Sequence, residues 1–172
     1  MSKIIRSLLI MISFVGIHCV SKSSGSLVVV AIPQTPILIP NGPPQHFGTR
    51  TISPPFFMVR QINVSYQGAG RINIFDLEFI HKTNGVNDFT CGFVGDEFAQ
   101  VFSGSTDAKG QVIMSQGQTL QTQPIVCAGI PLPNPLPETF NIPMTVRINA
   151  TTIDSNNNPT GRIKGEAVIT IQ

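Results

Sequence analysis

The sequence predicts an all-β fold, and within that class a single antiparallel two-sheet β-sandwich that is immunoglobulin-like in architecture. Apolar and polar residues alternate over 140–148 and again over 163–171, a period of two that is typical of strands with one buried face. Outside the first 26 residues, no stretch repeats its apolar residues at helical spacing. About seven short strands separated by turn residues are the pattern of a sandwich.

A change of apolar phase marks the segment 71–83. Its apolar residues occupy even positions up to Ile74 and odd positions from Phe75 onward, including Leu77 and Phe79. Because the side chains of a strand alternate between its two faces, this change predicts a β-bulge or a strand that bends from one sheet to the other.

Turn residues divide the rest of the predicted domain, which spans 56–172. The Asn-Gly pair at 84–85 predicts a hairpin. The apolar runs at 98–102 and 111–114 predict further short strands, and the acidic pair at 96–97 predicts a turn between elements.

The last two strands are joined by the turn formers "DSNNNPTG", 154–161. Before them, prolines alternate with other residues over 131–137, which predicts an extended crossover between two sheets.

Residues 1–26 read as a secretory leader. Lys3 and Arg6 form a basic start, the run "LLIMISFVGI" over 8–17 is apolar, and small residues follow. The apolar run is shorter than the about 20 residues that cross a membrane. We therefore expect export to the cell envelope or the extracellular space.

Cys19 ends this leader and resembles the lipidated cysteine of bacterial lipoproteins, with a basic start, a short apolar run and a Ser-rich tether around it. The resemblance covers about the first 25 residues and implies a lipid anchor, the only membrane contact we expect. Gly16 and His18 depart from the lipoprotein pattern. Removal of Cys19 with an ordinary signal peptide is the alternative.

The two remaining cysteines, Cys91 and Cys127, lie in apolar, strand-like contexts. In an exported chain they predict a disulfide, which chain-entropy arithmetic values at roughly 4 kcal/mol.

The segment 27–55 contains prolines at 33, 36, 40, 43, 44, 54 and 55. It is predicted to be an extended spacer, part of which could add an edge strand.

Charge excludes one class of function. The chain has 11 Lys and Arg; without Lys3 and Arg6, nine remain, equal to the nine Asp and Glu. A neutral chain with scattered basic residues lacks the electrostatic footprint of a nucleic-acid-binding protein. No metal-ligand spacing points to a cofactor, and we expect none.

The residues that could carry chemistry are few. Asp154, Asn156 and Asn158 match the start of a calcium loop, but Pro159 replaces its turn glycine. We therefore predict no metal site, with these three residues as the calcium candidate. The following residues are also notable: His46 and His81 as bases, Asp76 and Glu78 as an acid pair, and Asn63 and Asn149 as glycosylation sequons.

These features predict a non-enzymatic exported protein with a structural or protein-interaction role and an unidentified protein partner. We assign no catalytic residue. A small-ligand or calcium-binding β-sandwich module is the alternative, and an envelope hydrolase is the third reading. The absence of Trp and the single Tyr disfavour a carbohydrate-binding surface.

Overall fold

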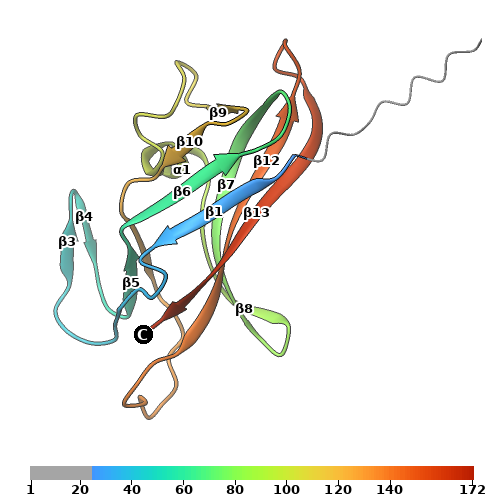
Figure 1. Cartoon of the computed structure of the whole chain (residues 1–172). Helices are drawn as coiled ribbons and strands as arrows, with labels where there is room; N and C mark the ends of the chain where they lie inside the picture. The colour runs from blue at the N-terminus through green and yellow to red at the C-terminus, as the bar shows by residue number, and fades with distance from the viewer. Residues whose placement is uncertain (1–24) are drawn as a thin grey trace, which may run out of the picture.

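The computed structural model describes residues 25–172, and these confirm the all-β class (Figure 1). They form thirteen strands and one short helix. The strands of the first half are β1 (Leu27–Ile32), β2 (Leu38–Ile39), β3 (Gln45–Phe47), β4 (Arg50–Ile52), β5 (Phe56–Val59), β6 (Gln61–Tyr66) and β7 (Arg71–Thr83). Those of the second half are β8 (Val86–Phe93), β9 (Val112–Ser115), β10 (Thr119–Gln121), β11 (Ile125–Ala128), β12 (Ile142–Ile153) and β13 (Pro159–Ile171).

The strands form four sheets in which every pair of neighbours is antiparallel. The largest has the order β13-β12-β7-β8, with β9 also paired to β7. Two three-stranded sheets have the orders β1-β6-β10 and β11-β5-β2, and β3 pairs with β4 alone. Only Arg60 separates β5 from β6, so one continuous run of chain contributes to both three-stranded sheets.

One hydrophobic core joins the three larger sheets. Alternate residues of several strands enter it, as in β6, where Ile62, Val64 and Tyr66 are buried and the residues between them are not. The predicted alternation at the C-terminus is confirmed by the long β12–β13 hairpin. The predicted crossover over 131–137 is also confirmed, because this segment is free of strands and connects β11 of one sheet to β12 of another.

The predicted Asn-Gly hairpin is confirmed between β7 and β8. Asn84 has a φ of 53° and Gly85 a φ of 80°, the two left-handed positions of a type I′ turn. The strands on either side pair from Thr83 and Val86 onward.

The predicted β-bulge is confirmed in β7. Asp76 lies opposite Asn149 and Ile74 lies opposite Ala150, so the residue between them, Phe75, has no partner on β12. The expectation that Phe75 shares a face with the core residues after it is wrong, because its side chain is 44% exposed. A bulge places two successive side chains on one face, and here both Phe75 and Asp76 point away from the core.

The expected spacer over 27–55 is corrected, because this segment contains the strands β1 and β2 and the β3–β4 hairpin. β1 pairs along its whole length with β6 and places Leu27, Val29 and Ala31 in the core. β2 pairs with β5, which realises the edge strand that the sequence left open. The prolines of 33–36 lie in the connection between these two strands, where no ladder needs their missing N–H.

Backbone hydrogen bonds tie this connection to the C-terminal end of the chain. The N–H groups of Thr170 and Gln172 donate to the carbonyls of Gln34 and Pro36, at 3.0 and 2.9 Å. The N–H of Leu38 donates to the carbonyl of Gln172 at 2.6 Å. The segment therefore joins the β11-β5-β2 sheet to β13.

The run at 98–102 was expected to be a strand, and this expectation is wrong. It belongs to the helix α1, Gly95–Val101, and the expected turn at 96–97 is the first turn of that helix. Phe98 and Phe102 pack against each other across one helical turn, with ring centroids 4.9 Å apart. A helix of seven residues is too short to show a periodic apolar stripe in the sequence.

Candidate functional site

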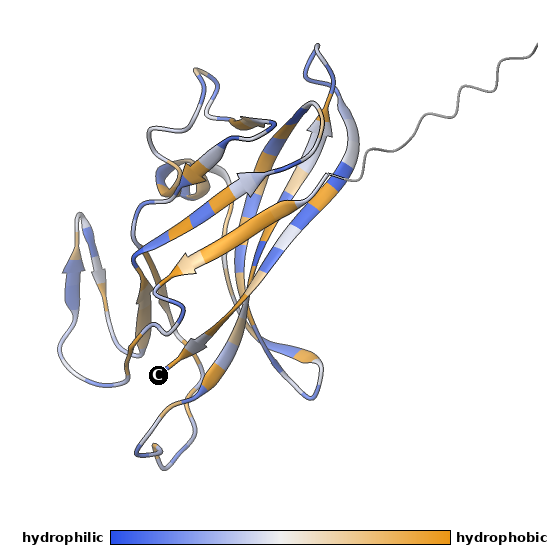
Figure 2. Cartoon of the chain, viewed as in Figure 1, coloured by the Kyte–Doolittle hydropathy of each residue, from blue (hydrophilic) through white to orange (hydrophobic). Residues whose placement is uncertain are grey.

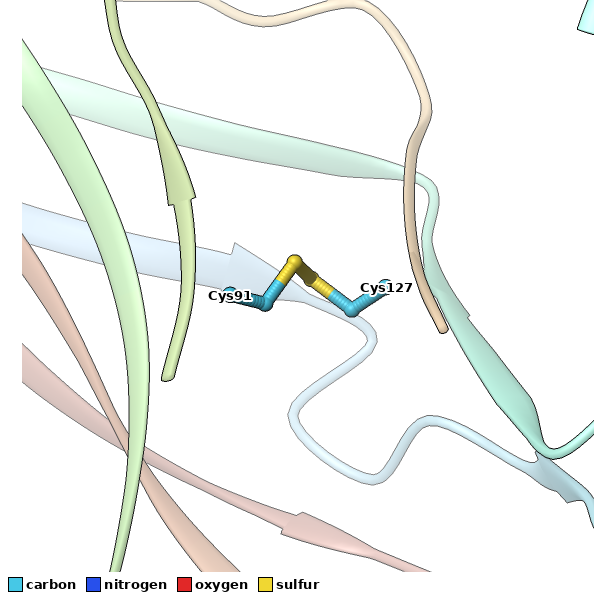
Figure 3. Close-up of a disulfide and its surroundings, with 2 residues drawn as sticks. All are labelled: Cys91 and Cys127. Carbon is cyan, nitrogen blue, oxygen red and sulfur yellow. A yellow bond between two sulfur atoms is a disulfide. The ribbon is translucent and has the colours of Figure 1, made fainter. Parts of the chain in front are cut away.

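The predicted disulfide is present between Cys91 and Cys127 (Figure 3). Cys91 lies on β8 and Cys127 on β11, with their Cα atoms 5.9 Å apart. The bond links the five-stranded sheet to the β11-β5-β2 sheet. This link lies at β11, whereas the backbone hydrogen bonds to β13 lie at β2, so the β11-β5-β2 sheet is joined to the five-stranded sheet at both of its edges.

Aromatic rings pack beside the disulfide. Cys127 is the cross-strand partner of Phe57, and Cys91 is the cross-strand partner of Phe79. The rings of Phe57 and Phe79 meet edge to face with centroids 5.7 Å apart, and Phe93 meets Phe79 at 6.4 Å. This environment is that of a structural cross-link in the core. Cys19, the lipidation candidate, lies outside the described residues 25–172.

The calcium candidate forms the tip of the β12–β13 hairpin. Oδ1 of Asp154 accepts hydrogen bonds from the backbone N–H groups of Asn156 and Asn158, both at 2.8 Å. The bonds from Asn158, followed by the weaker effects of Asn156 and Arg71, lower the pKa of Asp154. The carboxylate therefore holds the turn of the loop in shape.

Oxygen atoms of the same loop already bind a cation of the chain. Nη2 of Arg71 donates to the carbonyls of Asp154 and Ser155 at 3.0 and 3.3 Å, and to Oδ1 of Asn157 at 2.9 Å. Within the described residues, no three His, Cys, Asp or Glu side chains come together as metal ligands. The arrangement gives this loop a role in closing the hairpin.

The acid pair lies on the outer face of the five-stranded sheet, where each carboxylate has its own partner. Oδ2 of Asp76 accepts a hydrogen bond from Nδ2 of Asn149 at 2.7 Å, and Glu78 lies 3.7 Å from Arg147. Arg147 also binds Glu166 at 2.8 Å. These contacts form a cross-strand row of charges over β7, β12 and β13.

The two histidines lie apart, on different hairpins. His81 donates from Nδ1 to the carbonyl of Pro143 at 2.8 Å, and its Nε2 lies 3.8 Å from Asp88. His46 contacts the hydroxyl of Thr51 across the β3–β4 hairpin at 3.0 Å. The contacts of His81 join β7 to β12 and β8, and the contact of His46 joins β3 to β4.

The two sequons lie within strands. The amide oxygen of Asn63 accepts a hydrogen bond from Gln61 on β6. The amide nitrogen of Asn149, which a glycan would modify, is the donor to Asp76.

Sequence reasoning missed an apolar surface on the outer side of β1, β2 and β5. We call it the β1–β5 apolar face; its members are between 39% and 71% exposed and comprise Val28, Val30, Ile32, Ile37 and Met58. In Figure 2, β1 is orange along its whole length, since both of its faces are hydrophobic. The signal in the sequence was the run "LVVVAI", which is apolar in both phases.

A groove of about 320 Å³ adjoins this face. Ile37, Ile39 and Met58 contribute to it, and Phe47 of the β3–β4 hairpin forms a wall. Phe47 packs edge to face on Phe56, with ring centroids 5.5 Å apart. Arg60 is the one charged residue that lines the groove.

A second depression, of about 350 Å³, lies on the outer face of the five-stranded sheet around Phe75. Its other lining residues are Asn149, Ala150, Arg162, Ile163 and Lys164. The bulge in β7 and the register of β12 with β13 bring these residues together.

Two further observations concern membrane-spanning helices and related proteins. Across residues 25–172, no helix has both the length and the apolar character needed to cross a membrane. No protein-family model matches the sequence, and no curated protein matches it.

Proposed function

We propose that this chain is a non-enzymatic exported protein that binds an apolar segment of a protein partner on its β1–β5 apolar face. The observation that carries the proposal is the difference between its two outer faces. The outer face of the five-stranded sheet exposes Phe75 and Val168, but it also carries the row of Glu78, Arg147 and Glu166, as expected of a face in water. On the β1–β5 apolar face, Val28, Val30 and Ile32 share one side of β1, while Ile37 and Met58 line one groove with Pro33. Large exposed apolar patches mark interaction sites.

The proposed architecture is a two-layer sandwich with an immunoglobulin-like arrangement. The continuous run through Arg60 supports one layer made of both three-stranded sheets, with the five-stranded sheet as the other. The disulfide and the bonds to Thr170 and Gln172 would then close the two layers at opposite edges.

Export is supported by the leader-like residues 1–26 and by the disulfide, because such bonds persist in oxidising compartments. Whether the chain is attached to the envelope through Cys19 or released after cleavage, the β1–β5 apolar face would be available to a protein outside the cell.

The groove indicates the chemistry of the partner. Ile37, Ile39 and Met58 suit aliphatic or aromatic side chains, and Arg60 suits one carboxylate near them. We therefore propose as the occupant an extended partner segment with two or three apolar residues and an Asp or Glu.

Cross-linking in cells followed by reconstitution tests this proposal. A photoreactive side chain is placed at Ile37, which is 71% exposed. For comparison, another is placed at Val86, which is 70% exposed. We expect one protein to cross-link from position 37 and not from position 86. The purified partner should then bind the full chain, and the double variant Ile37→Asp, Met58→Asp should weaken binding by about tenfold or more.

Three results would overturn the proposal. The first is identical cross-linked products from positions 37 and 86. The second is a product formed only between copies of this chain, which would make the face a homo-oligomer interface. The third is an affinity for the identified partner that the double variant leaves unchanged.

A further inference from the structure

Phe75 is the most exposed phenylalanine among the described residues, with 44% of its surface accessible. It lies on β7, in the interior of the five-stranded sheet, which has β12 on one side of β7 and both β8 and β9 on the other. A ring that remains partly exposed here can contact a ligand, and the polar groups around it decide which ligand it suits.

The β-bulge sets the direction of the ring. Because Phe75 has no partner on β12, it and Asp76 both point outward, and an apolar ring lies next to a carboxylate. Bulges of this kind often re-aim a side chain near a functional site.

An amide, a carboxylate and two basic side chains lie near the ring. Asn149 and Asp76 share one hydrogen bond, which leaves Oδ1 of each side chain able to accept another. Arg162 lines the depression, and its side chain makes no hydrogen bond or ion pair to the other described residues. Lys164 also lines it, held at 3.2 Å from Glu166.

From this arrangement we propose that the Phe75 depression binds an acidic sugar residue, a pyranose that carries a carboxylate. The C–H face of a pyranose packs on an aromatic ring, as the amphipathic nature of both predicts. Its hydroxyls can donate to Asn149 and Asp76, and its carboxylate can accept the paired N–H groups of Arg162. A simple anion would not use the ring, and a hydrocarbon would not use the guanidinium.

The volume fits this occupant. About 350 Å³ is at the small end of ligand sites and has room for one or two sugar rings. A shallow site on a sheet face binds a single residue weakly, so the natural ligand would be a polysaccharide that offers many such residues.

Nuclear magnetic resonance titration of the full chain tests the proposal, with trigalacturonic acid as the probe and the neutral galactose trisaccharide beside it. We expect saturable shifts of the backbone amides of Phe75, Asn149 and Lys164 with the acidic probe. The variants Phe75→Leu and Arg162→Gln should each raise the dissociation constant about tenfold. Val86→Ala, which also trims an exposed apolar side chain of a strand, is the matched control and should leave it unchanged.

Each of the following results would overturn the proposal. Equal binding of the neutral trisaccharide would remove the role of the carboxylate. Equal shifts with acetate, or an affinity that Phe75→Leu does not alter, would reduce the site to a surface attraction for anions. An absence of shifts at about 10 mM probe, above the about 1 mM expected of a weak site, would mean no sugar site at all. Unchanged spectra away from the depression would show that both variants remain folded.

Discussion

The close approach of β1 to β13 makes Gly165→Ala an informative substitution. An added Cβ at Gly165 would lie 2.5 Å from the carbonyl oxygen of Leu27 and 2.7 Å from Cγ2 of Val29. The nearest atom belongs to the backbone, so the overlap is relieved only if β1 moves away from β13. Overpacking of this kind costs about 1–3 kcal/mol. Replacing a strand glycine by alanine returns about 0.5–1 kcal/mol.

We therefore expect Gly165→Ala to lower the free energy of unfolding by about 1–2 kcal/mol. The matched control is Gly92→Ala on β8, where an added Cβ meets no atom within 4 Å and should stabilise slightly. Urea denaturation with the disulfide intact measures both values. In thermal unfolding, Gly165→Ala should lower the midpoint by about 2–8 °C.

Equal stabilities of the two variants would refute this reasoning. They would mean that Gly165 has space for a methyl group, hence that β1 does not lie against β13. The placement of Leu27 and Val29 against β13 would then be wrong.

Three further predictions concern the core and the loops. Replacing both Cys91 and Cys127 by Ala should lower stability by roughly 4 kcal/mol, measured by urea denaturation without reductant; an unchanged midpoint would contradict the cross-link. Phe79→Ala should cost about 3–5 kcal/mol, because the ring is fully buried between Phe57 and Phe93; a loss below about 1 kcal/mol would argue against that cluster. The lowered pKa of Asp154 means that its contribution to stability is present above its ordinary value of 3.8 and is lost as the pH falls through the folded value. Asp154→Asn should therefore reduce the acid sensitivity of unfolding, and a variant as acid-sensitive as the parent chain would contradict the role of the carboxylate.

Features that depend on residues close together along the chain could be predicted from the sequence. The hairpin at 84–85 follows from two residues that tolerate a left-handed backbone. The β12–β13 hairpin follows from alternation, and the bulge follows from a phase change that a regular strand cannot contain. The disulfide follows from the cysteine count together with the expectation of export.

The role of β1 could not be predicted, because its signal is ambiguous. The run at 27–32 is apolar in both phases, follows an apolar leader and precedes prolines. It therefore matches the end of a leader as well as a strand. The pairing with β6 and the close approach of Gly165 to Leu27 and Val29 separate the two readings, and both involve residues far away in the chain.

The Phe75 depression escaped prediction for a related reason. The sequence shows that the strand changes phase, but not which residue is left without a partner. Arg162 and Lys164 reach the ring only through the registers of three strands, β7, β12 and β13. The sequence disfavoured a carbohydrate-binding surface because Trp is absent and Tyr occurs once, and an exposed phenylalanine was not expected because the phase of β7 placed Phe75 with the core residues.

The β1–β5 apolar face and the Phe75 depression are independent, because they lie on different sheets. The β1–β5 apolar face belongs to strands of the three-stranded sheets, whereas the Phe75 depression belongs to the five-stranded sheet. The groove borders the β11-β5-β2 sheet, which the disulfide holds at β11 and backbone hydrogen bonds hold at β2. A groove held at both edges needs little rearrangement to accept a ligand, so less binding energy is lost to ordering. Reduction of the disulfide should therefore weaken a partner at the apolar face more than a sugar at Phe75, since β12 and β13 hold the second site without the cross-link.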